Sequence, residues 1–136
     1  MMLFWDTSAV LAMVVLEPHS AAALQAAAQA TQSYAWRWLE VEASAGLARR
    51  RATDEQRRGL ERILAALSYA DIPPARCADI ARENRAWRLR AADAGHVFCF
   101  RQLSTVFPGM QMVCFDTEIS AAVSAAGLPL WKEELC

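Results

Sequence analysis

The sequence contains a single lysine, two histidines and no long apolar run, and each shortage excludes a class of protein. A helix that crosses a bilayer needs about 20 consecutive apolar residues. No stretch here approaches that length, so we expect no contact with a membrane. The apolar stretch from Ala9 to Leu16 is preceded by Asp6 and by no lysine or arginine, which argues against a secretory signal.

The four cysteines lack the paired spacing that is typical of a zinc site. They stand at positions 77, 99, 114 and 136, with no C-x-x-C pair and no histidine cluster nearby. Cys99 and Cys114 lie in apolar runs, where we expect buried, reduced thiols. Reduced thiols agree with a cytoplasmic location.

The composition predicts one globular domain over residues 1–136. A chain of 136 residues with 55% hydrophobic content can bury a core without disulfide or metal support. The net charge of -1 does not indicate a partner, but thirteen of the fourteen cationic residues are arginine. Arginine suits bidentate contact with phosphate, although arginines on helices also form ordinary solvated surfaces. Most of them fall in two stretches, namely Arg49, Arg50, Arg51, Arg57, Arg58 and Arg62, then Arg76, Arg82, Arg85, Arg88 and Arg90.

Short strands alternate with helices along the chain, which predicts an α/β protein with a mostly parallel sheet. The expected strands are 2–5, 33–36, 110–115 and 128–131, with a minimal strand within 71–74. The expected helices are 8–16, 20–30, 36–51, 53–69, 75–87, 92–106 and 117–126.

Two of the strands end on an aspartate that opens a helix. These residues are Asp6 and Asp116. Ligands of open parallel sheets collect where strands end and helices begin, so the two carboxylates indicate a cation site. Each also has a simpler explanation, which is that it caps the next helix by accepting backbone N–H bonds.

Glu42 lies on the apolar stripe of its predicted helix, whereas Glu40 points nearly the opposite way. A lone carboxylate held against a core is costly unless it is paired or bound to a metal. We therefore assign Glu42 to the site and Glu40 to the surface. Gly46, one turn further on, leaves room for the close approach of another segment.

Asp93 begins a helix whose inward face carries Val97, Phe100 and Ser104, so it is expected beside the two strand-end aspartates. Its simpler role is again that of an acid at a helix N-terminus. Four carboxylates without basic partners repel strongly unless a cation is present. Oxygen ligands favour Mg²⁺ or Mn²⁺, and such ions support hydrolysis of a phosphodiester by activating water and stabilising charge on the phosphate.

Four segments resemble the motifs of PIN-domain ribonucleases, especially the VapC toxins of bacterial toxin–antitoxin pairs. They occur in the expected order between residues 3 and 130. The segments are Asp6-Thr7-Ser8-Ala9-Val10-Leu11-Ala12, Glu42-Ala43-Ser44-Ala45-Gly46-Leu47-Ala48-Arg49, Leu89-Arg90-Ala91-Ala92-Asp93-Ala94-Gly95-His96, and Cys114-Phe115-Asp116 followed by Ala121-Ala122 and Gly127-Leu128.

The resemblance implies a PIN-like α/β/α sandwich and a Mg²⁺- or Mn²⁺-dependent endoribonuclease. It further implies an RNA substrate, a homodimer and inhibition by a cognate antitoxin protein. Asp6, Glu42, Asp93 and Asp116 would be the metal-binding and catalytic acids. Ser8 would orient phosphate or water while also serving as a helix cap, and we expect Arg49 and Arg50 to contact RNA. His96 is expected to be a packed or hydrogen-bonding support rather than a ligand, and Glu118 a surface acid rather than an outer ligand.

The sequence departs from the family pattern at three points. Gly95 replaces a common leucine, Cys114 stands where Thr or Ser is frequent, and the run 97–100 is bulkier than usual. These are packing changes that leave the acids in place. The alternative function is a PIN-like module that binds RNA or protein without cutting. A haloacid-dehalogenase-type phosphatase would need an acid at position 8, and a receiver domain a suitably placed late lysine, so both are discounted.

Overall fold

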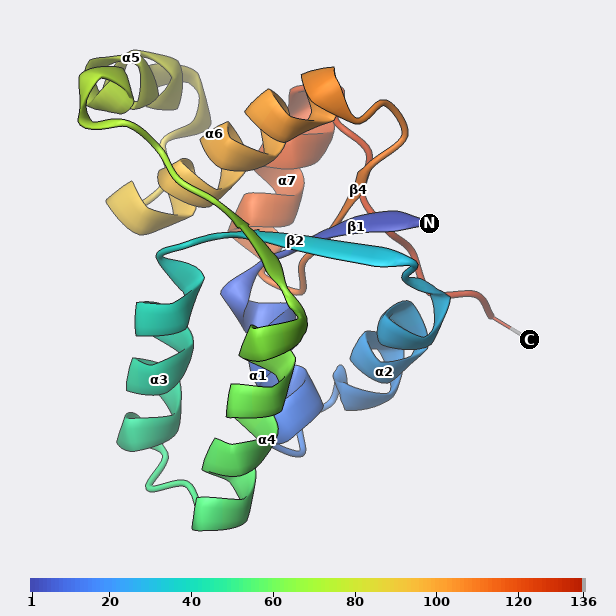
Figure 1. The fold of residues 1–136 in the computed structure, drawn as a ribbon. Coiled ribbons are helices and arrows are strands. Elements are labelled where there is room, and N and C mark those ends of the chain that lie inside the picture. The colour runs from blue at the N-terminus through green and yellow to red at the C-terminus, as the bar shows by residue number, and fades with distance from the viewer. Residues whose placement is uncertain (136) are drawn as a thin grey trace.

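The computed structural model of the chain describes residues 1–135 (Figure 1). Cys136 lies outside the described residues. The elements follow one another along the chain as β1 (Met2–Trp5), α1 (Thr7–Val14), α2 (Ser20–Gln29), β2 (Gln32–Trp36), α3 (Leu39–Arg49), α4 (Asp54–Ala66), β3 (Ser68–Ala70), a 3-10 turn (Pro74–Arg76), α5 (Cys77–Trp87), α6 (Ala91–Val106), β4 (Gln111–Val113) and α7 (Thr117–Ala125).

The four strands form one parallel sheet in the order β3-β2-β1-β4. Phe4 of β1 lies beside Tyr34 of β2, and Trp5 lies beside Val113 of β4. Because all strands run the same way, their carboxyl ends meet at one edge of the sheet. The segments that leave β1, β2 and β4 therefore start close to one another.

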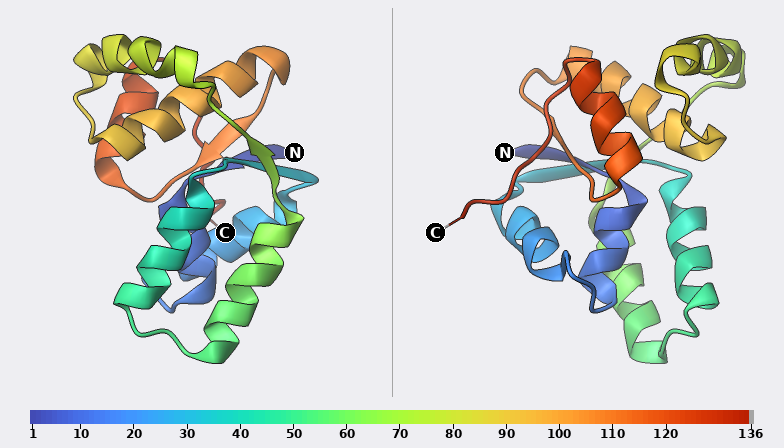
Figure 2. Two further views of the ribbon diagram at one scale, coloured as in Figure 1. Left: turned by 60° about the vertical axis from the view of Figure 1, so that its left-hand side comes forward. Right: turned by 180° about the vertical axis from the view of Figure 1, so that it is seen from behind.

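Helices cover both faces of the sheet, which makes the molecule an α/β/α sandwich (Figures 1 and 2). The layer of α1 to α4 packs against one face, and α5, α6 and α7 lie on the other. Side chains of β1 alternate between the layers, as the pleat requires. Leu3 and Trp5 enter the core with α1 to α4, while Phe4 enters the core with α6 and α7. The predicted fold class is confirmed.

Two strand predictions were wrong in detail. The helix expected up to Tyr69 ends at Ala66, and residues 68–70 form β3 beside β2, so the strand lies before residues 71–74 rather than within them. Pro73 and Pro74 lack the N–H groups that a sheet ladder needs. The strand expected over 128–131 is reduced to an isolated bridge between Met112 and Leu130.

The thiols of the described residues match the expectation for Cys99 and only partly for Cys114. Cys77, Cys99 and Cys114 are free, with Cys99 buried and Cys114 only half-buried. No helix within residues 1–135 combines the length and the apolar character needed to cross a membrane.

Candidate functional site

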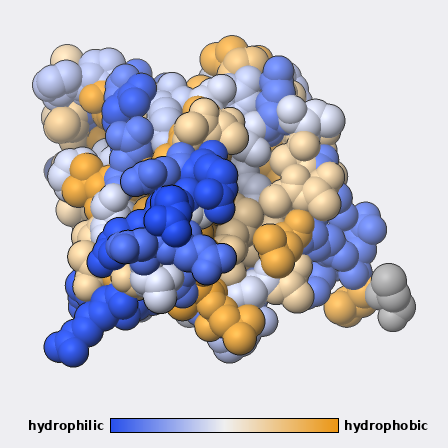
Figure 3. All heavy atoms as spheres, turned by 60° about the horizontal axis from the view of Figure 1, so that its bottom comes forward, coloured by the Kyte–Doolittle hydropathy of each residue, from blue (hydrophilic) through white to orange (hydrophobic). Residues whose placement is uncertain are grey.

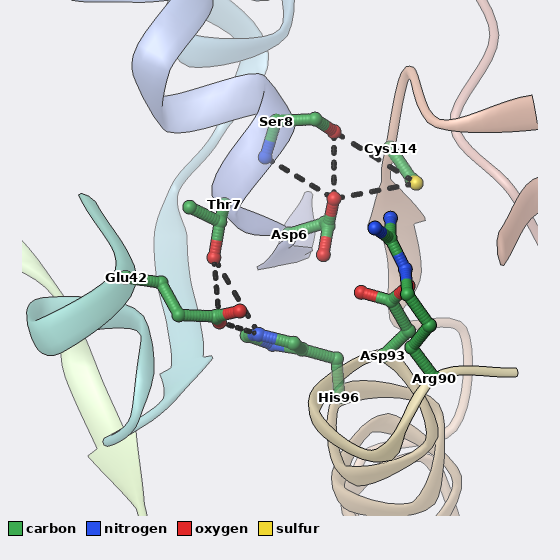
Figure 4. A network of polar contacts seen from close by, with 8 residues as sticks. All are labelled: Asp6, Thr7, Ser8, Glu42, Arg90, Asp93, His96 and Cys114. Atoms are coloured by element: carbon green, nitrogen blue, oxygen red, sulfur yellow. Dashed lines mark hydrogen bonds and ion pairs between the residues drawn. The ribbon is translucent and has the colours of Figure 1, made fainter. Parts of the chain in front are cut away.

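The parallel sheet brings Asp6 and Asp116 to the same edge, as the sequence predicts. The register that pairs Trp5 with Val113 continues for one more step, because the Asp6 N–H donates to the Val113 carbonyl at 3.0 Å. Asp6 is therefore next to Cys114, and Asp116 follows two residues later. Figure 4 shows the polar network that surrounds Asp6.

Both aspartates also cap helices, so the simpler explanation holds for one oxygen of each. Asp6 Oδ2 accepts from the Ser8 N–H at 3.2 Å at the start of α1. Asp116 Oδ1 accepts from the Ile119 N–H at 2.9 Å at the start of α7. Asp6 is buried, with 3% of its surface exposed. Capping thus fixes the direction of both carboxylates.

Ser8 ties the first strand end to the last. Its hydroxyl donates to Asp6 Oδ2 at 2.6 Å and accepts from the Phe115 N–H at 3.1 Å. The Cys114 thiol also donates to Asp6 Oδ2, at 3.5 Å. Burial and then the charge of Asp6 raise the pKa of the Cys114 thiol, so it remains a protonated donor. Cys114 thereby supplies a weak hydrogen-bond donor to Asp6.

Glu42 reaches the site from α3 and is held by two donors from other elements (Figure 4). Its Oε1 accepts from the Thr7 hydroxyl at 3.0 Å and is hydrogen-bonded to His96 Nε2. Burial acts to raise the pKa of Glu42, but the His96 hydrogen bond and charge and the Thr7 hydrogen bond outweigh it and lower the pKa. Glu42 is therefore ionised.

The contrast between Glu42 and Glu40 is confirmed. The Glu42 side chain is 25% exposed and faces the network, whereas Glu40 is 43% exposed and pairs with Arg37 at 3.7 Å. Gly46 does permit a close approach, because a Cβ there would lie 2.8 Å from Leu11 Cδ1 of α1. This contact lets α3 lie close to the helix that begins at Asp6.

The departure at Gly95 has a packing explanation. A Cβ at this position would overlap the indole ring of Trp36, so only glycine leaves room for it. The same indole lies edge-on to the His96 ring, with the centroids 5.0 Å apart. Trp36 thus fills the space beside Gly95 and packs against the histidine ring.

Asp93 lies in the first turn of α6 and does have a basic partner, contrary to the expectation of four acids without one. Arg90 Nε donates to Asp93 Oδ2 at 3.4 Å, with the arginine side chain 81% exposed. Burial, followed by the charges of Asp6 and Asp116, nevertheless raises the pKa of Asp93 against the attraction of Arg90. The four acids therefore include at least three that interact electrostatically.

Each of the four carboxylates keeps one oxygen without a hydrogen-bond partner among residues 1–135. The occupied atoms are Asp6 Oδ2, Glu42 Oε1, Asp93 Oδ2 and Asp116 Oδ1. These four remaining oxygens lack a hydrogen-bond partner within the described residues, but they are not fully buried. Hard, anionic oxygens with no protein donor are ligands that suit Mg²⁺ or Mn²⁺. The described side chains nevertheless contain no group of three or more His, Cys, Asp or Glu residues already arranged around an ion position.

A cavity of about 480 Å³ adjoins the acids and contains several of the predicted substrate residues. Its lining includes Ser8, Glu42, Arg49, Arg50, Arg90 and Asp116. Arg50 is occupied, since its guanidinium contacts Glu17 at 3.2 Å and the Gly46 carbonyl at 3.1 Å. Arg49 is exposed and forms no ion pair with any of residues 1–135. Hydrophilic side chains gather over the end of the molecule where α3 turns into α4 (Figure 3).

Sequence reasoning missed the site contacts of Thr7 and Arg90 and placed Glu118 correctly on the surface. Glu118 is exposed and lines a separate groove between α5 and α7. The i,i+3 spacing of Arg90 and Asp93 gave a usable signal for their ion pair. Thr7 gave none beyond helix capping, because its partners are 35 and 89 residues away.

The comparisons with known proteins concern the fold. No protein-family model and no curated protein matches the chain. Among solved structures, the chain is similar to the crystal structure of PAE2754 from Pyrobaculum aerophilum, with a TM-score of 0.61 and 20% sequence identity over 89% of this chain and 78% of that one. At this identity the likeness establishes architecture alone. The chain therefore has a parallel, PIN-like α/β fold.

Proposed function

We propose that the protein is a Mg²⁺- or Mn²⁺-dependent endoribonuclease that hydrolyses RNA phosphodiesters. One observation carries the proposal, namely that four carboxylates from four elements each leave one oxygen without a protein donor at the same edge of the sheet. Asp6, Glu42, Asp93 and Asp116 would hold the cation. A bound divalent ion supplies positive charge to the scissile phosphate and activates water as the nucleophile.

The chain's own residues would arrange the substrate. Ser8 already donates to Asp6 and lines the cavity, so its hydroxyl stands beside the position proposed for the phosphate. Arg49 would contact an RNA phosphate, because its guanidinium is exposed at the cavity and is not paired within residues 1–135. Arg50 would have a smaller role, since Glu17 already neutralises it. Its ion pair with Glu17 holds α3 against the segment that follows α1.

A cleavage assay tests the proposed activity. The purified chain, free of any antitoxin, is expected to cut structured RNA in Mg²⁺ or Mn²⁺ and to stop when EDTA removes the ion. Folded protein that leaves transfer, ribosomal and messenger RNA intact in both metals would refute the nuclease. Cutting that continues unchanged in EDTA would refute the role of the metal.

One arrangement favours a second function, an RNA- or protein-binding module that cuts nothing. Asp93 is paired with Arg90, and no ion position is already assembled among the described side chains. A module of this kind would retain RNA or a protein without hydrolysing RNA. The same assay distinguishes the two functions when binding is measured alongside cleavage.

We further propose that the nuclease is a toxin with a cognate antitoxin and that it acts as a homodimer. Trp38 and Val41 at the start of α3 are 46% and 51% exposed, and exposed apolar side chains of this size suit a protein contact. Expression in a bacterial host is expected to arrest growth, and co-expression of a small protein encoded next to the gene should relieve the arrest. Normal growth at high expression of the folded chain would contradict the toxin role.

A further inference from the structure

We infer that Thr7 and His96 are positioning residues that fix the Glu42 carboxylate for metal binding. The inference deepens the proposed function and rests on it. Neither residue would touch the ion or the RNA. They act through Glu42, which carries the ligand oxygen.

The two residues hold one oxygen of Glu42 and leave the other available (Figure 4). Thr7 Oγ1 donates to Oε1 at 3.0 Å, and His96 Nε2 bonds the same atom. None of residues 1–135 hydrogen-bonds Oε2, and Glu42 lines the cavity. A carboxylate anchored through one oxygen presents the other in a defined direction.

Thr7 also couples Glu42 to Asp6. It follows Asp6 directly, and the next residue, Ser8, donates to the Asp6 carboxylate at 2.6 Å. Adjacent hydroxyls at the start of α1 therefore hold one acid each, Asp6 just after β1 and Glu42 on α3. Because both hydroxyls belong to the first turn of α1, this turn sets the distance between the Asp6 and Glu42 carboxylates.

The surroundings of His96 specify its orientation. The side chain is 1% exposed, and its Nδ1 is buried without a hydrogen-bond partner. A proton on Nε2 can be donated to Glu42, whereas a lone pair there would face the lone pairs of the carboxylate. The hydrogen bonding therefore assigns a proton to Nε2 in either charge state of the ring. Trp36, packed edge-on to the ring, keeps Nε2 turned toward Glu42.

The test measures Mn²⁺ binding to the full chain by electron paramagnetic resonance or calorimetry, with melting curves as the check on folding. His96→Gln keeps an N–H near the Nε2 position, whereas His96→Leu removes it. Thr7→Ser keeps the hydroxyl, and Thr7→Val removes it at equal volume. We expect the Gln and Ser variants to bind close to wild type, and the Leu and Val variants to bind about 10–100-fold more weakly.

The outcomes separate the inference from the function on which it rests. Wild-type affinity in folded His96→Leu and Thr7→Val would overturn the positioning role while leaving the nuclease intact. A wild-type chain that binds no Mn²⁺ would overturn the proposed function and the inference together. If His96→Leu fails to fold, the two Thr7 variants decide, because Thr7 is half-buried at a helix start whereas His96 is fully buried.

Discussion

Asp93→Asn should strongly reduce RNA cleavage and at the same time raise the melting temperature of the metal-free protein. Loss of a carboxylate that holds the ion removes several kcal/mol of transition-state stabilisation, which corresponds to about 10²–10³-fold in rate. Stability should change in the opposite direction. The raised pKa of Asp93 means that burial and the charges of Asp6 and Asp116 outweigh the attraction of Arg90, so the folded state disfavours the ionised carboxyl.

The stability difference should depend on pH in a defined direction. Because the folded-state pKa of Asp93 is raised, the folded protein binds its proton at a higher pH than the unfolded chain does. Wild-type stability therefore gains this contribution as pH falls through the raised pKa, and lacks it at neutral pH. The advantage of the Asn variant is expected to be greatest at neutral pH and to shrink on acidification. Each 1 kcal/mol of relieved repulsion corresponds to roughly 3–5 °C for a domain of this size.

Melting curves with and without Mg²⁺ measure this effect. Glu61→Gln is the matched control, since Glu61 is exposed in the middle of α4 and far from the acids along the chain. It should leave cleavage and melting temperature unchanged. Mg²⁺ should stabilise wild type more than Asp93→Asn. An Asn variant that is less stable than wild type at neutral pH, or that cuts RNA at the wild-type rate, would remove Asp93 from the acidic site.

The second large effect separates two glutamates that stand two residues apart. Glu42→Gln should reduce cleavage by about 10²–10³-fold, because it neutralises an acid that lines the cavity. Glu40→Gln should be nearly neutral, since it loses only an exposed pair with Arg37, and such pairs contribute about 0–1 kcal/mol. Parallel rate measurements on the two folded variants provide the comparison. Equal loss in both variants, or a greater loss from Glu40→Gln, would contradict the assignment of the helix faces.

Much of the fold was predictable because its signals are local. The strand before Asp6, the helix after Thr53 and the opposite faces of Glu40 and Glu42 follow from apolar spacing and capping, and all appear in the structure. Strand β3 was misplaced because residues 68–70 carry little strand signal of their own. Their pairing with β2, 34 residues earlier, makes them a strand. A pattern that extends over a few residues does not indicate a pairing partner so distant in the sequence.

For the candidate site too, the local features were predictable and the long-range contacts were not. The sequence placed the four acids at one edge through parallel-strand geometry, and the structure brings Asp6, Asp93 and Asp116 within electrostatic reach of one another. It did not reveal that Thr7 and His96 share Glu42, because that contact depends on how α1, α3 and α6 pack. The metal-binding role of the four acids and the RNA contacts of the arginines remain predictions. The glycine at position 95 depends on a residue distant in the sequence, because a Cβ there would overlap the indole of Trp36.

The sheet order has a consequence for the moment at which the acids assemble. Strand β1 lies between β2 and β4, and β4 is the last strand along the chain. Cys114 and Asp6 are 108 residues apart in sequence yet in contact. During synthesis from the N-terminus, Asp6 and Glu42 leave the ribosome well before β4 and Asp116. A nascent chain therefore lacks part of its acidic set while it is surrounded by ribosomal and messenger RNA, and the set is complete only after β4 and Asp116 have been synthesised.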